Sequence, residues 1–144
     1  MAFAVSLGGM KELEGKLNKL TTALKVDVSD EINASALKIE NQAKRLAPVN
    51  FGQLRNSIYL KEKSNDKGYI FTIGSSASYA PYVEFGTGGE VNVPAGYETF
   101  AIQFKGKGIR KINLRARPYL IPAFESEIPI LRKNIKNVIA NVKS

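Results

Sequence analysis

The stretch SIYLKEKSNDKGYIFTIG, residues 57–74, decides the fold. Two β-prone runs, residues 57–61 and 69–74, flank a polar segment at 64–68 whose composition and length suit a hairpin turn. Strict alternation places Ile58 and Leu60 on one face of the first run, and Phe71 and Ile73 on one face of the second. We therefore expect an antiparallel hairpin in the middle of the chain.

A helical pattern precedes the hairpin. Apolar or small residues recur in steps of three and four, which is the spacing of one helical face. This stripe consists of Met10, Leu13, Leu17, Leu20, Leu24, Val28, Ile32, Ala36, Ile39, Ala43 and Leu46. Pro48 ends the pattern because it disfavours helix at the residue before it. Residues 26–31 are a weak point, where Ser29 or Asp30 suits a new N-cap, so we expect one long helix or two helices that share a face.

A second helical pattern ends the chain. Pro122 suits the first turn of a helix, and apolar residues follow it at helical spacing from Phe124 to Val142. Between the hairpin and this helix, residues 86–117 contain six glycines and only short β-like pieces at 99–104 and 112–114. We interpret 86–117 as an extended arm that projects from the domain. The order of elements predicts one α+β domain over residues 1–144.

The composition argues against an enzyme. The chain contains no cysteine and no histidine, which excludes disulfides, thiolate zinc sites and every Ser-His arrangement. Glu84 is the most interesting carboxylate because Tyr79, Tyr82 and Phe85 surround it in sequence, and such a group could have a raised pKa. We favour a structural role for Glu84 as an acceptor of hydrogen bonds from backbone or tyrosine groups. We expect no catalytic residue, no cofactor, no metal and no membrane segment.

The positive charge is concentrated in the arm. The chain has a formal net charge of +8, which favours an anionic partner. Six cations lie within thirteen residues that include no acid: Lys105, Lys107, Arg110, Lys111, Arg115 and Arg117. The arm is either a solvated loop or a segment that meets DNA phosphates or an acidic patch on a neighbouring protein.

Three segments, in order, carry a resemblance. They are AKRLAPVNFGQLRNSI at 43–58, SYAPYVEFGT at 78–87 and ARPYLIPAF at 116–124. Together they resemble the phage head–tail joining family, also known as tail-component or neck proteins and typified by gene product ten of a lambdoid coliphage. The similarity covers about residues 10–142, with the arm as its divergent part. Phe51 stands where the family often has Thr, and Tyr119 where it often has Phe.

The motif residues also have physical roles in the fold. They are Pro48, Gly52, Leu54, Arg55, Tyr79, Tyr82, Glu84, Phe85, Gly86, Pro118 and Pro122. Gly52 permits a turn into the hairpin, and Arg55 is expected to pair with a nearby acceptor, for which we choose Glu84. The aromatic residues of the second segment are expected to pack the turn after the hairpin onto the core. The two prolines of the third segment are expected to bracket a short extended piece anchored by Tyr119 and Leu120.

The resemblance implies an assembly function. It predicts a structural virion protein that forms a ring of six or twelve copies at the neck or upper tail, joins head to tail and lets genome DNA pass during ejection. Its partners would be other copies of the chain, adjacent head-completion or connector proteins, tail-terminator or tail-tube proteins, and the genome DNA in the lumen. The protein would assemble in the host cytoplasm. The alternative is a small basic nucleic-acid-binding protein, which would bind free DNA as a monomer.

Overall fold

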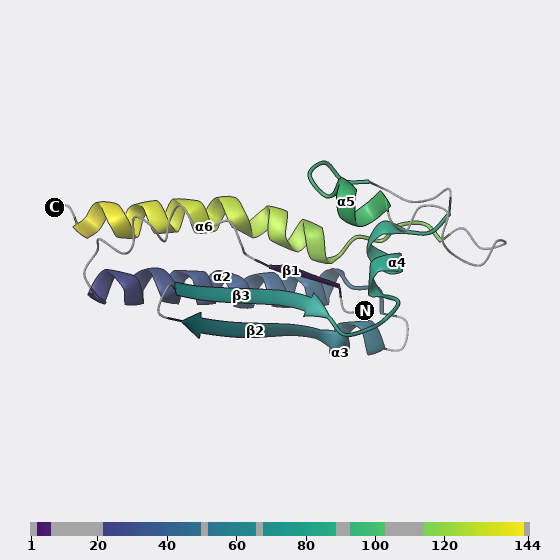
Figure 1. Cartoon of the computed structure of the whole chain (residues 1–144), viewed down its shortest axis with the longest axis horizontal. Helices are drawn as coiled ribbons and strands as arrows, with labels where there is room; N and C mark the ends of the chain where they lie inside the picture. The colour runs from purple at the N-terminus through teal and green to yellow at the C-terminus, as the bar shows by residue number, and fades with distance from the viewer. Residues whose placement is uncertain are drawn as a thin grey trace.

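The structure, a computed structural model, describes residues 3–6, 22–49, 52–65, 68–88, 93–102 and 114–142. Its elements in chain order are β1 (Phe3–Ser6), α2 (Thr22–Leu46), α3 (Gln53–Ser57), β2 (Ile58–Asn65), β3 (Gly68–Ser75), α4 (Ala80–Phe85), α5 (Glu98–Ala101) and α6 (Leu120–Val142). Helices α2 and α6 run side by side in opposite directions, and the sheet lies along α2 (Figure 1). The predicted α+β class is confirmed.

Helix α2 is the central element, because it contacts α6 as well as strands β2 and β3. Its buried side chains repeat at helical spacing and are Leu24, Val28, Ile32, Ser35, Ala36, Ile39 and Ala43. The helix is continuous through residues 26–31, so the described part forms one helix and neither Ser29 nor Asp30 is an N-cap. Burial of the apolar side chains outweighs the low helix propensities of this segment. The part of the predicted stripe at 10–21 lies outside the described residues.

The predicted hairpin is confirmed and belongs to a three-stranded antiparallel sheet in the order β1-β3-β2. Strands β2 and β3 pair from Ile58 opposite Ser75 to Asn65 opposite Gly68. Phe71 and Ile73 are buried, whereas Ile70 is exposed, as the alternation predicts. The sequence did not reveal β1, because four residues are too few to show a period; this strand pairs with β3 over 72–75.

Two short helices stand where the sequence predicted a turn and a β-strand. Gly52 adopts φ 69°, the left-handed conformation that the predicted turn requires, but a one-turn helix, α3, follows it before the strand begins. The β-strand prediction for 99–104 is wrong in its described part, which forms α5 and the residue after it, Ile102. Within α5, only Ala101 is buried in the core. This one small side chain attaches the helix to the core, whereas a strand would bury every second residue.

The last helix begins at Leu120, so Pro122 lies in its first turn as predicted. The extended piece before it is therefore shorter than the interval between the two prolines. At the base of the arm, the Thr87 amide donates to the Leu114 carbonyl, and the Leu114 amide donates to Thr87 Oγ1, both at 2.9 Å. These bonds join the two ends of segment 86–117. Within this segment, Ala101 is fully buried and Tyr97 packs against the core, so the described residues 93–102 do not project from the domain as predicted. Among the described helices, none is both long and apolar enough to span a bilayer.

Because α2 is central, a cavity in its buried face should destabilise the whole fold. Ile39 on α2 is fully buried, and Ile39→Ala should lower the free energy of unfolding by about 2–5 kcal/mol, because it removes packed atoms and leaves a cavity. Leu37→Ala on the exposed side of the same helix is the control and should change it by about 0.5 kcal/mol or less. Urea denaturation measures both; equal losses would contradict the assigned orientation of α2.

Candidate functional site

The three sequence motifs meet at one end of the molecule, where α3, α4 and the start of α6 lie together (Figure 1). They surround a groove of about 350 Å³ that we call the motif groove. Its lining consists of Pro48, Leu54, Tyr79, Tyr82, Val83, Leu114, Arg115 and Arg117. The Arg117 amide donates to the Val83 carbonyl at 2.8 Å, which fixes the third motif against the second.

Glu84 is the polar centre of this end and is 1% exposed. Its Oε2 accepts hydrogen bonds from the amides of Tyr119 and Leu120 at 2.8 and 2.9 Å, and its Oε1 accepts one from the Ile121 amide at 2.9 Å. The first amides of a helix have no partner within the helix, and the helix dipole favours a negative group beside them. Glu84 therefore caps the N-terminus of α6 from a distant segment. The predicted role as a hydrogen-bond acceptor is confirmed, although the sequence did not identify the donors.

Opposing effects act on the ionisation of Glu84. Burial raises the pKa of its carboxyl above 4.5 and outweighs the three amide donors, which lower it. Burial also raises the pKa of the neighbouring Tyr119 phenol; the charge of Glu84 adds to this shift, and the Ser75 side chain opposes it. The Tyr119 hydroxyl is buried without a well-formed hydrogen bond. The aromatic ring is thus the part of Tyr119 that anchors this segment, and a phenylalanine would serve the same purpose.

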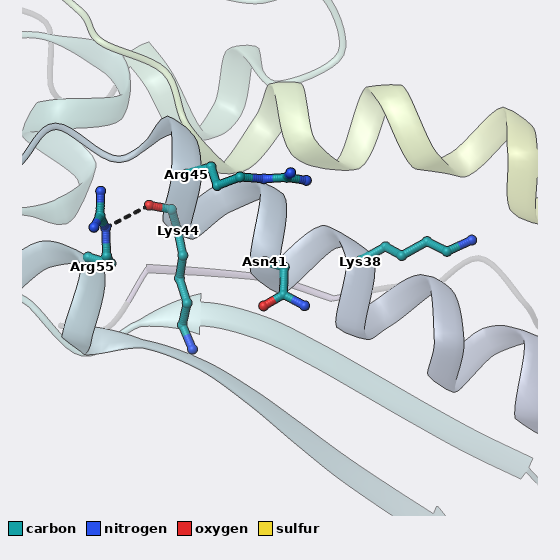
Figure 2. A pocket seen from close by; sticks show the side chains of 5 residues that line it. All are labelled: Lys38, Asn41, Lys44, Arg45 and Arg55. Atoms are coloured by element: carbon teal, nitrogen blue, oxygen red, sulfur yellow. Dashed lines mark hydrogen bonds between the residues drawn. The ribbon is translucent and has the colours of Figure 1, made fainter.

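Arg55 does not pair with Glu84, and that prediction is wrong. Its Nε donates to the Lys44 carbonyl at 3.0 Å, in the last turn of α2 (Figure 2). The last carbonyls of a helix lack partners within the helix, and a cation beside them is favourable. Arg55 therefore caps the C-terminus of α2, while Glu84 caps the N-terminus of α6.

The remaining motif residues divide into core and surface. Leu54 and Phe85 are buried as the packing prediction requires, and Gly86 ends α4 with φ 80°. Tyr82 is half-buried, whereas Tyr79 is 39% exposed, so the expected packing of Tyr79 onto the core is wrong. Tyr79 instead lines the motif groove and forms the N-terminal boundary of α4.

A second groove, of about 620 Å³, lies along the C-terminal half of α2 (Figure 2). We call it the basic groove, and its lining consists of Lys38, Asn41, Lys44, Arg45 and Arg55. The sequence does not reveal this groove, because its cations are dispersed along the polar face of a helix. The only available signal was the three- and four-residue spacing of Lys38, Asn41, Lys44 and Arg45.

The predicted cations of the arm are only partly placed. Arg115 and Arg117 are exposed and line the motif groove. Lys105, Lys107, Arg110 and Lys111 lie outside the described residues. Within the described part of the chain, no group of three or more His, Cys, Asp or Glu side chains is placed to hold a metal ion.

Comparison with known proteins identifies a family. The profile of a family described as "Bacteriophage HK97-gp10, putative tail-component" matches residues 11–86. The match includes the described helix α2, the hairpin and α4 with Glu84. It ends at residue 86, so it covers the first segment of the resemblance and all but the last residue of the second, and not the third, at 116–124. No curated protein and no solved structure matches the chain.

The cap on α6 predicts the effect of removing the Glu84 carboxylate. Glu84→Gln keeps the size of the side chain but replaces one acceptor oxygen with an amide group that can only donate, so at least one α6 amide loses its partner. The free energy of unfolding should fall by about 1–3 kcal/mol. The control is Glu125→Gln, which removes an exposed carboxylate from the start of the same helix and should cost less than about 1 kcal/mol. Equal effects in a denaturation experiment would contradict the cap.

The raised pKa of Glu84 predicts the pH dependence of this effect. A carboxyl whose pKa is higher in the folded chain binds protons more tightly there, so it adds stability at low pH and loses this contribution as pH rises. The stability advantage of the wild type over Glu84→Gln should therefore be largest below pH 4.5 and should decrease as pH rises through the raised pKa. Denaturation curves across the pH range measure it. An advantage that grows with pH would show that the amide donors outweigh burial.

Proposed function

The chain belongs to the HK97 gp10-like family of phage tail components, and on this premise we propose that it forms a ring at the head–tail interface. As a tail component it is part of the virion. The ring joins head to tail and leaves a lumen through which genome DNA passes during ejection. Six or twelve copies make up the ring, which assembles in the host cytoplasm.

The observation that carries this proposal is the use of the motif residues in the fold. Glu84, the carboxylate with the strongest case for a chemical role in the sequence, already accepts hydrogen bonds from three backbone amides at the start of α6. Arg55 donates to the end of α2. Because these charged side chains build one end of the molecule, we propose that this end serves docking and that the protein is not an enzyme.

The surface carries two different patches, the motif groove and the exposed side of α5, and in the proposed ring the first on one subunit contacts the second on the next. The motif groove combines apolar and aromatic walls with two exposed arginines. Elsewhere, α5 and the residue after it present Phe100 and Ile102, which are 49% and 58% exposed. Contiguous exposed apolar surface is typical of interaction sites, and we propose that Phe100 and Ile102 contribute to such a surface. A contact between two different patches of identical chains generates a ring when its rotation closes.

The other partners follow from the place of the ring. We propose that the upper and lower faces of the ring contact head-completion or connector proteins and tail-terminator or tail-tube proteins. The rival function, a small nucleic-acid-binding protein, is favoured by the net charge of +8. The two differ in one property: the rival requires tight binding of free DNA by the monomer at about 150 mM salt, whereas a ring component binds weakly as a monomer.

The proposal is tested in the phage itself. Cryo-EM of intact virions should show the chain as a ring between head and tail. A phage that lacks the gene should accumulate filled heads and separate tails, and expression of the wild-type chain from a plasmid should restore joining. Absence of the protein from purified virions, or normal joining without it, would contradict the proposal.

A further inference from the structure

The basic groove has a composition that structural roles explain only in part. Four of its five lining side chains are cations, and the fifth is an amide. Lys44 pairs with Glu40 at 2.7 Å, and Arg55 caps α2. These contacts account for Lys44 and Arg55 as parts of the fold. Lys38 and Arg45 remain to be explained.

Lys38 and Arg45 are not fixed by strong ion pairs. The Lys38 ammonium lies 3.6 Å from Oε1 of the buried Glu127, which also accepts a hydrogen bond from Ser35 Oγ at 2.9 Å. The Lys38 side chain itself is 59% exposed, so solvent screens this long ion pair. Arg45 donates to the amide oxygen of Gln42 at 2.7 Å, an uncharged and exposed acceptor. No described carboxylate forms a salt bridge with Arg45. The helix dipole favours a cation at Arg45 in the last turn, but Lys38 lies two turns earlier.

The lining indicates which class of anion fits. No apolar or aromatic side chain is among the described residues that line the basic groove, whereas the motif groove has Leu54, Tyr79 and Tyr82. Protein interfaces depend on aromatic and apolar anchors at their centre. Contacts to the DNA backbone come instead from Lys, Arg and Asn side chains. The motif groove therefore has the chemistry of a protein contact, and the basic groove that of a phosphate contact.

The spacing of the cations agrees with a DNA strand. The interval from Lys38 to Arg45 is seven residues of continuous helix, or about 10 Å along its axis. One strand of duplex DNA advances about 3.4 Å along its axis per phosphate. The groove thus spans about three phosphates. In Figure 2, the side chains of Lys38 and Arg45 extend in the same direction along α2, while Arg55 rises from α3 at the far end.

We propose that the basic groove contacts the sugar–phosphate backbone of the genome DNA as it passes through the ring. This inference rests on the proposed function, and it makes the surface of α3 and the C-terminal half of α2 the DNA-facing side of each subunit. The contact neutralises phosphates and reads no base sequence.

The test uses the full chain and a short DNA duplex of mixed sequence. Lys38→Gln/Arg45→Gln removes the two exposed cations of the groove and leaves the half-buried Lys44 and Arg55 in place. The matched control, Arg132→Gln/Lys133→Gln, also removes one arginine and one lysine, from exposed positions on α6 outside the groove. The affinity is measured at several salt concentrations between about 25 and 200 mM by fluorescence anisotropy. Thermal unfolding confirms that both variants are folded.

The groove variant should reduce the slope of log affinity against log salt by about 2, one for each cation removed from the phosphates, and the control should leave the slope unchanged. Equal reductions in both variants would overturn the proposal, because they would reflect net charge alone. The proposal would also be overturned if the groove variant kept the wild-type slope for DNA but no longer bound poly-glutamate, used as a mimic of an acidic protein. The groove would then be assigned to an acidic protein surface. The ring is judged separately in virions. A ring with no groove effect refutes only the groove, whereas a groove effect without a ring refutes the proposed function and leaves a phosphate contact that does not depend on a ring.

Discussion

The Glu84 carboxylate, buried against the first turn of α6, is the interaction on which the rest of the structure depends. Helix α6 packs along α2, and α2 in turn covers the sheet. Glu84 connects this layered body to α4, the short helix that follows the hairpin. A buried carboxylate is costly without partners, and three amide donors compensate for much of that cost while they fix where α6 begins.

The antiparallel arrangement of α2 and α6 brings the C-terminus of one helix beside the N-terminus of the other (Figure 1). Arg55 satisfies a carbonyl at the first, and Glu84 satisfies amides at the second. The motifs that carry the family resemblance therefore build one end of the molecule. The motif groove at the same end is lined by aromatic and arginine side chains.

The sequence predicted those features of the fold that depend on periodic burial. The helical stripe from Leu24 to Ala43 and the alternation of Phe71 and Ile73 correspond to buried side chains in the structure, whereas Leu46, the last predicted member of the stripe, is 42% exposed. It could not predict β1, α3 or α5, which are too short to show a period. At the site, a structural role for Glu84 was foreseen, but its donors lie 35 to 37 residues away, and local patterns do not specify such partners. The incorrect pairing of Arg55 with Glu84 has the same cause.

Amide hydrogen exchange at the start of α6 tests the structural role of the motif most directly. If Glu84 holds this turn in place, the amides of Tyr119, Leu120 and Ile121 should exchange only through global unfolding, with the same protection as the amide of Ile39 in the centre of α2. Rapid exchange at these three positions, together with slow exchange at Ile39, would contradict the claim that the Glu84 carboxylate anchors this end of the molecule.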